Sequence, residues 1–477
     1  MDAADTRKRA LQGSVWTLFG YGGAQVLRLG SNLVLAHLLF PSAFGVMALV
    51  TVFMQGLQMF SEVGIGPSII QNSKGDDREF LDTAWTIQIL RGFALWIFSC
   101  LLAWPASVFF GTNDPSGADL LYILPVIGFS SVLGGFNSTA VFSLNRHLRI
   151  ASITWLELIP QAISVLGMIV WAMIWPSVWA MVSGWLIYSL VRLPLSHWLN
   201  RPLKNRMAWD RDCAREILHF GKWIFFGTIV AFLSGSLDRI LMGRLLTLDE
   251  LGVYSIALTF ARVGVEVSTR LSHTVLFPVL AKSQHDPTTL VGQSIQARSL
   301  ILLAGGAIVN GFAIFSPVFF GLLYDSRYAA AGTIAQWLSI LVWSSILLSS
   351  MERVPLALGH PRALFTSNLI SIFGYGLALP LYHFAGLPGF IIGISSGLIL
   401  AQVVLLTWIP IRRKDVFMQS LRFTLLYGFY AGVCIYVLRG QSPHFSLFEK
   451  IFYPLACSTI PCAIAARIAL RRLKTKR

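Results

Sequence analysis

The stretch WTLFGYGGAQVLRLGSNLVLAHLLFPSAFGV, residues 16–46, has a second, altered copy later in this chain of 477 residues. The copy is WIFFGTIVAFLSGSLDRILMGRLLTLDELGV, residues 223–253, and it aligns without a gap. The offset is 207 residues, the distance from Trp16 to Trp223 and from Val46 to Val253. Eight residues are identical: Trp16, Phe19, Gly20, Ala24, Leu38, Leu39, Gly45 and Val46 correspond to Trp223, Phe226, Gly227, Ala231, Leu245, Leu246, Gly252 and Val253. This pattern indicates an internal repeat.

The composition places most of the chain in a membrane. Hydrophobic residues make up 55% of the chain and charged residues only 12%, a balance that the surface of a soluble domain does not tolerate. Apolar runs of about 20 residues, enough to cross about 30 Å of hydrocarbon, recur along the chain. We expect an all-α polytopic membrane protein with about fourteen transmembrane helices, at 14–39, 43–70, 83–108, 120–143, 150–174, 177–199, 219–246, 251–278, 299–323, 329–350, 364–385, 388–410, 422–438 and 450–470.

Lysine and arginine residues predict the orientation of these helices. They gather in alternate connections, on the side where both termini lie, and Arg298 is assigned to one of these connections. The opposite connections hold only Arg327, Arg439 and Lys450. Because positive residues mark the cytoplasmic side, both termini are expected in the cytoplasm. The formal net charge of +15 then reflects orientation, and no nucleic-acid partner is expected.

The repeat divides the predicted helices into two lobes. Six helices precede the second copy, so both copies cross the membrane in the same direction, related by a pseudo-two-fold axis along the membrane normal. We expect an N-lobe with six helices, a basic cytoplasmic linker, a C-lobe with six helices, and two extra helices with a basic cytoplasmic tail. Their residues are 1–200, 201–218, 219–410 and 411–477.

No motif in the sequence predicts an enzyme. The predicted connections are too short for a soluble catalytic domain, and the phosphate-binding pattern G-x-x-x-x-G-K-[ST] is absent from the sequence. Asp210 and Asp212 form a D-x-D pattern, but without a nucleotide-binding domain they predict a solvated loop or a helix start. The five cysteines form no CxxC pair. We therefore expect no enzyme activity, no metal and no cofactor.

A polar stripe interrupts the apolar segment 251–278. Its members recur at intervals of three or four residues and so share one face of a helix that turns about 100° per residue. A charge that faces lipid at the bilayer centre costs several kcal/mol, so such residues normally face a protein interior or a water-filled cavity. We expect a cavity to be lined by Ser255, Thr259, Arg262, Glu266, Arg270 and His273.

The first lobe carries a matching set of polar residues. On each of the first two predicted helices, three of them share the spacing i, i+3, i+7 and hence one helix face. They are Gln25, Arg28 and Asn32, and Gln55, Gln58 and Glu62. Further charges within predicted helices are Arg91, Glu157, Arg192, Asp238 and Arg239.

Arginines outnumber acidic residues within the predicted helices. The cavity should therefore be cationic and should suit an anionic cargo, because guanidinium groups bind phosphate through two parallel hydrogen bonds. Structural ion pairs between helices are the alternative role for each of these residues.

Six stretches, in this order along the predicted helices, point to a family: LAHLLFPSAFGVMALV (35–50), FSEVGIGPSIIQ (60–71), LDTAWTIQILRG (81–92), LFPVLAK (276–282), FFGLLYDSRYAAAG (319–332) and ALGHPRALF (357–365). They resemble the polysaccharide exporters and Wzx-type oligosaccharide flippases, which are relatives of the multidrug and toxin extrusion transporters. The family often has Gly where this chain has Asp325, so this loop is expected to differ in detail.

The resemblance implies two six-helix lobes that form a V, with two additional C-terminal helices. It also implies alternating access that moves undecaprenyl-diphosphate-linked sugar units to the outer leaflet of a bacterial inner membrane, for exopolysaccharide, O-antigen or capsule synthesis. The implied partners are this lipid-linked oligosaccharide, membrane lipids and the polysaccharide polymerase machinery.

The family has no single fixed set of substrate residues, so we nominate residues from the helical geometry. For substrate binding they are Arg28, Arg91, Arg262, Arg270, Gln25, Asn32, Gln55 and Gln58. For coupling to H⁺ or Na⁺, or for ion pairing, they are Glu62, Glu266, His273, Asp238 and Arg239.

Three alternatives stay open on the sequence. A lipid-linked peptidoglycan-precursor flippase would share the fold and the arginine-rich cavity. A multidrug cation antiporter would share the fold but should carry an acidic site in the first lobe, where the first predicted helix has Arg28 and no acid. A membrane sugar transferase or polymerase is disfavoured by the short connections.

Overall fold

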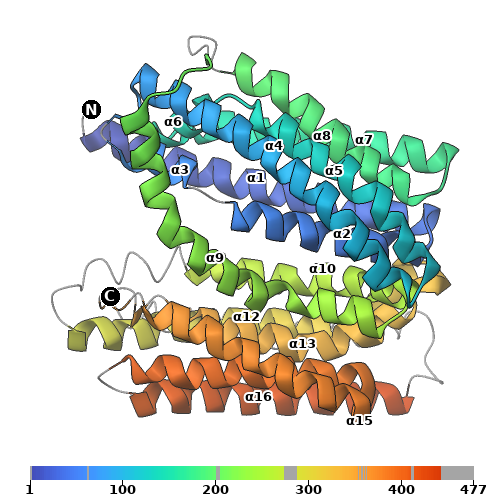
Figure 1. Ribbon diagram of the computed structural model, residues 1–477. Helices are drawn as coiled ribbons and strands as arrows, with labels where there is room; N and C mark the ends of the chain where they lie inside the picture. Colours follow the sequence, from blue (N-terminus) through green and yellow to red (C-terminus); the bar gives the residue numbers. More distant parts are fainter. Residues whose placement is uncertain are drawn as a thin grey trace. The chain divides into compact units, whose positions relative to one another are not determined.

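The computed structural model describes residues 3–61, 64–72, 74–199, 205–272, 287–352, 354–355, 358, 360, 362–409 and 413–441. Every regular element within these residues is a helix (Figure 1). The α-helices are α1 (Ala3–Leu38), α2 (Pro41–Phe60), α3 (Ile65–Gln71), α4 (Arg78–Gly111), α5 (Leu120–Gly135), α6 (Ala140–Arg146), α7 (Ile150–Ile174), α8 (Val178–Trp198), α9 (Arg211–Leu245), α10 (Leu248–Leu271), α12 (Pro287–Leu323), α13 (Ala330–Ser349), α15 (Arg362–Thr407) and α16 (Arg413–Gln441). Two short 3₁₀ helices are η1 (Pro115–Asp119) and η3 (Ser326–Tyr328). The predicted all-α fold class is confirmed.

The helices overlap the predicted membrane spans. The predicted spans 43–70 and 120–143 are each divided between a long and a short helix, α2 and α3, and α5 and α6. Among the described residues, 9 helices are long and apolar enough to cross a membrane by length and composition. The helix α15 contains two predicted spans, which meet at a kink where Gly386 has a positive φ of 63°. Three further predicted spans correspond to the more polar helices α1, α9 and α16. The last predicted span, 450–470, lies outside the described residues.

The chain divides into two compact units. The first comprises residues 1–232 and 238–252, and the second comprises residues 233–237 and 253–477. Most of α9, which the repeat assigns to the second lobe, therefore packs with the first unit. Within the first unit, α4 packs along α5, α7 along α8, and α1 on α7 (Figure 1). Small residues permit this approach: a side chain at Gly20 of α1 would meet Thr154 of α7.

In the second unit, α12 packs against both α13 and α16, and α13 packs on α15. The two arms of α15 approach through Gly374 and Gly397, where an added Cβ on either residue would meet the other's backbone. The helix α16 docks on α12 where Tyr427 covers Gly306. The hydroxyl of Tyr427 donates a hydrogen bond to the carbonyl oxygen of Leu303 at 2.9 Å.

The internal repeat is confirmed by the helix ends. The helix α1 ends at Leu38 and α2 begins at Pro41, while α9 ends at Leu245 and α10 begins at Leu248. Both boundaries recur at the offset of 207 residues that the sequence shows.

The two turns of the repeat contact each other. The N–H of Ser42 donates to Asp249 Oδ1 at 2.8 Å, and these residues are 207 positions apart. A side chain at Gly45 would overlap the carbonyl of Leu248, and one at Gly252 would overlap the carbonyl of Pro41. Equivalent positions of the two copies therefore meet where the two turns pack on each other.

Candidate functional site

The polar stripe of α10 lies on the helix face predicted from its spacing. Ser255, Thr259, Arg262 and Glu266 are half-buried and Arg270 is exposed. Residues 256–258 and 261, on the other side of the helix, are buried. The Nη2 atom of Arg262 donates to the carbonyl oxygen of Gly235 in α9 at 3.0 Å. The stripe therefore lies on the accessible side of α10, which also includes half-buried Phe260, Val263 and Val267. One of its guanidinium groups is oriented by the neighbouring helix.

The nominated residues of α1 and α2 also lie on accessible faces. Gln25, Arg28, Asn32 and Gln55 are half-buried, and Gln58 is exposed. The amide of Gln25 donates to the hydroxyl of Tyr21, one turn earlier, at 2.9 Å. These faces therefore present one guanidinium among several amide groups.

Arg91 of α4 holds the end of α2. Its Nε donates to Ser61 Oγ at 2.9 Å and its Nη2 donates to the carbonyl oxygen of Gln58 at 3.0 Å. Ser61 is the C-cap residue of α2, and its hydroxyl donates to the same carbonyl at 3.0 Å. A cation at this position satisfies a carbonyl of the last turn and complements the helix dipole. The contacts give Arg91 a positioning role, and its role as a substrate ligand stays a prediction.

Arg298 of α12 makes the same arrangement in the second unit. Its Nε donates to Ser350 Oγ at 2.9 Å and its Nη2 to the carbonyl oxygen of Leu347 at 3.3 Å. Ser350 is the C-cap residue of α13 and donates to that carbonyl at 2.8 Å. The assignment of Arg298 to a connection was wrong, because it lies inside a helix. Arg298 lies 207 residues after Arg91, the offset of the internal repeat. This correspondence is the sequence signal that could have identified Arg298.

The helix α16 encloses Arg298. The guanidinium also donates to Gln419 Oε1 at 3.1 Å, to the carbonyl of Val416 at 3.4 Å and to Ser420 Oγ at 3.0 Å. Arg298 has 0% of its surface exposed, and it forms no ion pair with an acidic side chain in the part of the chain that the structure describes. Neutral hydrogen-bond acceptors therefore solvate this buried charge.

Charged residues in α7, α8 and α9 form ion pairs. Arg192 Nη2 lies 2.7 Å from Glu157 Oε1, and the hydroxyl of Tyr188 donates to Glu157 Oε2 at 2.5 Å. Asp238 Oδ1 and Arg239 Nε lie 4.0 Å apart, and both residues are buried. The contact between α7 and α8 favours the structural alternative for Glu157 and Arg192. Asp238 and Arg239 are neighbours on α9, so their contact joins no two helices.

The D-x-D pattern of Asp210 and Asp212 lies at the start of a helix, one of the two positions predicted for it. Asp210 is the N-cap of α9, and its Oδ1 accepts a hydrogen bond from the N–H of Cys213 at 2.8 Å. This backbone hydrogen bond holds the pKa of the Asp210 carboxyl below its ordinary value. Asp212 lies in the first turn of α9. Within the described ranges, no group of three or more His, Cys, Asp or Glu side chains is arranged to hold a metal.

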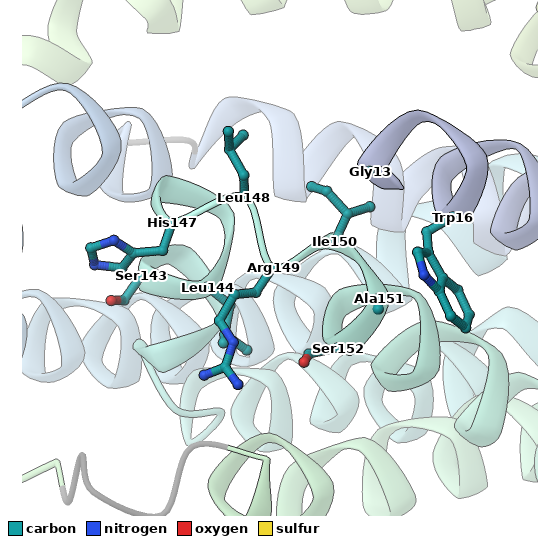
Figure 2. Close-up of a pocket in the computed structure, with 10 residues that line it drawn as sticks. All are labelled: Gly13, Trp16, Ser143, Leu144, His147, Leu148, Arg149, Ile150, Ala151 and Ser152. Carbon is teal, nitrogen blue, oxygen red and sulfur yellow. The ribbon is translucent and has the colours of Figure 1, made fainter. Parts of the chain in front are cut away.

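The remaining nominated residues are Glu62 and His273, which lie outside the described residues. Their roles in coupling stay predictions. The other nominated residues are described, and none of them lines the cavity of about 810 Å³ between α1, α6 and α7 (Figure 2).

Comparison with known proteins identifies the family. The polysaccharide biosynthesis protein family matches residues 34–332, more than half of the chain. The chain belongs to this family. The family resemblance expected from the sequence is thereby confirmed.

Relatives of this chain have low sequence identity over long alignments. The lipopolysaccharide biosynthesis protein WzxC of Escherichia coli (strain K12) is 22% identical over 405 residues, which cover 83% of this chain and 79% of the relative. The succinoglycan biosynthesis transport protein ExoT of Rhizobium meliloti (strain 1021) is 22% identical over 310 residues, which cover 64% of this chain and 59% of the relative.

A solved structure shares the fold of this family member. The lipid II flippase MurJ, in its inward closed conformation, is 16% identical and superposes with a TM-score of 0.71. The alignment covers 96% of this chain and 100% of MurJ. At this identity the likeness concerns the fold.

Proposed function

We propose that this protein is a flippase that moves undecaprenyl-diphosphate-linked oligosaccharide units across a bacterial inner membrane by alternating access. Family membership supports a role in polysaccharide biosynthesis, and the relative named as a succinoglycan transport protein supports transport. The observation that carries the proposal is the stripe of α10, where Arg262 and Arg270 lie on an accessible helix face within a chain of apolar helices.

The arginines of the stripe suit the diphosphate of such a substrate. A guanidinium group binds phosphate oxygens through a planar fork, and the attraction is stronger away from bulk water. The bond from Arg262 to the carbonyl of Gly235 fixes the direction of its fork. In the first unit, Gln25, Asn32 and Gln55 supply amide groups that both donate and accept hydrogen bonds, as sugar hydroxyl groups require.

Coupling and orientation belong to the same proposal. Both termini lie in the cytoplasm, because lysine and arginine are concentrated in the connections on that side. H⁺ or Na⁺ coupling acts through Glu62, Glu266 or His273, and the substrate is transported without chemical change. The polymerase machinery receives the unit at the outer leaflet.

The test compares cells that lack the gene with cells that carry the wild type or the double variant Arg262→Ala/Arg270→Ala. The matched control is Arg211→Ala/Arg215→Ala, because these two arginines are exposed in the first turns of α9 and lie outside the stripe. Without the protein, and with the stripe variant at equal protein level, we expect lipid-linked oligosaccharide to accumulate and surface polymer to fall about tenfold or more, since each charged hydrogen bond contributes about 1.5–3 kcal/mol. The control should restore both.

Other outcomes separate the alternatives. Unchanged polymer in the stripe variant would remove the substrate role of the two arginines, and loss of the protein itself would assign them to structural ion pairs. Accumulation of the peptidoglycan precursor instead of the oligosaccharide would identify a precursor flippase. Sensitivity to cationic drugs with normal lipid-linked sugars would identify a multidrug antiporter.

A further inference from the structure

A cavity of about 810 Å³ lies in the first unit, where α1 meets the turn between α6 and α7 (Figure 2). Gly13 and Trp16 of α1 line one part of it, and His147, Arg149 and Ser152 of the turn and α7 line another. None of the described lining residues is acidic. None of the described residues that the proposed transport function uses lines this cavity.

The turn between α6 and α7 has an unusual backbone. Leu148 has a φ of 56°, and it is the one non-glycine residue with a positive φ in the described ranges, a conformation that leucine rarely adopts. The side chains of Leu148 and Arg149 leave the turn in opposite directions (Figure 2). The backbone conformation therefore separates the apolar side chain from the guanidinium that lines the cavity.

Of the basic residues around this turn, Arg146 and His147 have an acidic partner, and Arg149 has none among the described residues. Arg146 and His147 each contact the carboxylate of Asp76 at 3.1 Å, and Ser143 donates to it at 3.2 Å. Asp76 is thus already engaged by three groups. The Arg149 guanidinium has no hydrogen bond or ion pair with any residue that the structure describes. The cavity therefore contains an uncompensated positive charge.

Trp16 connects the cavity to an exposed aromatic surface. Its ring centroid lies 5.7 Å from that of Phe19 and 6.1 Å from that of Trp155. Phe19 and Trp155 are exposed, as are Val15 and Leu18 on α1. Tryptophan is enriched at the level of lipid headgroups, and apolar helix surface beyond it contacts acyl chains. A free cation beside an exposed apolar surface is the combination that a lipid headgroup and its chains require.

We propose that this cavity binds the phosphate group of a membrane lipid. Arg149 and the hydroxyl of Ser152 bind the phosphate oxygens, and the chains of the lipid pass along Phe19 and Trp155. Guanidinium groups form strong hydrogen bonds with phosphate, and basic pockets between transmembrane helices are typical sites for anionic headgroups. Two lipid classes share this chemistry: an anionic phospholipid of the bilayer and a polyprenyl phosphate.

Native mass spectrometry of the purified full-length protein in detergent tests the site. The probes are phosphatidylglycerol, phosphatidylcholine, undecaprenyl phosphate and inorganic phosphate. We compare the wild type with Arg149→Gln, with Arg149→Lys and with Arg211→Gln, an exposed arginine outside the cavity. We expect the Kd for the preferred anionic lipid to rise about tenfold in Arg149→Gln, to rise less in Arg149→Lys, which keeps the charge, and to stay unchanged in Arg211→Gln. Phosphatidylcholine should bind more weakly than the preferred lipid.

The results also distinguish the source of the phosphate. Tighter binding of phosphatidylglycerol assigns the cavity to bilayer phospholipid, and tighter binding of undecaprenyl phosphate assigns it to a polyprenyl carrier; either supports the proposal if Arg149→Gln weakens it. Inorganic phosphate that binds as tightly as both lipids would overturn the lipid assignment. Equal affinities in Arg149→Gln and the wild type, or equal losses in Arg149→Gln and Arg211→Gln, would overturn the site. Because Arg149 is exposed, an unchanged Tm should show that its variants fold.

Discussion

Arg91 in the first unit and Arg298 in the second hold the same kind of helix end in different surroundings. Each donates from Nε to a C-cap serine and from Nη2 to the carbonyl three residues before that serine. Arg91 is half-buried, whereas Arg298 is fully buried and also binds Gln419 and Ser420 of α16. Arg91 joins two helices, α4 and α2. Arg298 joins three, because α12 contacts both α13 and α16 through it.

The difference shows that surroundings decide how much one contact contributes. A half-buried arginine exchanges its protein partners for water at little cost, whereas a buried one has no such replacement. The arginine pair should therefore respond unequally to the same substitution. The glycines Gly45 and Gly252 should respond equally, because each meets a carbonyl of the other turn.

The largest expected effect is that of Arg298→Met. We expect the free energy of unfolding to fall by about 3 kcal/mol. The variant loses charged hydrogen bonds and packs less well, and this loss outweighs the gain from no longer burying a charge. Arg91→Met should cost only about 1 kcal/mol, since water can reach the vacated groups. Unfolding by a denaturing detergent in mixed micelles measures both variants. Equal losses of unfolding free energy at the two positions would contradict the inference that burial by α16 makes the Arg298 contacts more stabilising.

The second effect concerns Gly45 and Gly252. Gly45→Ala and Gly252→Ala should each lower the free energy of unfolding by about 2–3 kcal/mol, because the new methyl group overlaps a carbonyl of the opposite turn. The control is Gly22→Ala in α1, where an added Cβ meets nothing within 4 Å. This control should gain about 0.5–1 kcal/mol from the better helix propensity of alanine. A clear inequality between Gly45→Ala and Gly252→Ala would show that the two turns do not pack symmetrically.

The smallest effect compares the two serines that cap the helix ends. Ser350→Ala should cost about 1–2 kcal/mol, because the buried Nε of Arg298 loses its acceptor. Ser61→Ala should cost about 0.5 kcal/mol. Its partner Arg91 is half-buried, so water can replace the hydroxyl as acceptor for the guanidinium. Combining each serine variant with the methionine variant of its arginine gives the coupling energy in a double-mutant cycle. A coupling energy near zero for Ser350 and Arg298 would contradict a stabilising hydrogen bond from Arg298 Nε to Ser350 Oγ.

Much of the fold was predictable from local patterns. Apolar runs of sufficient length located the helices, and the 3.6-residue period placed Arg262 and Glu266 on the accessible face of α10. The offset of 207 residues predicted the matching ends of α1 and α9. These features depend on residues near one another in the chain, or on a comparison of the sequence with itself.

The partners of the charged residues were not predictable in the same way. Glu157 and Arg192 appeared as isolated charges in the sequence, yet the packing of α7 on α8 brings them within 2.7 Å. Arg91 was nominated for substrate, but its contacts place it at the end of α2. Such contacts depend on the rotation and depth at which distant helices meet, and hydropathy carries no information about either.

By itself, the sequence determined that this chain forms membrane-spanning helices, that its first helices recur in a second copy, and that α10 carries a polar face. Hydrophobic transfer and helical periodicity are local properties, so they can be derived from the residues in order. Only the tertiary structure decided that Gly45 and Gly252 each pack on the turn of the other copy and that α16 encloses Arg298. It alone left Arg149 beside a cavity, because which charges find partners depends on how the helices pack.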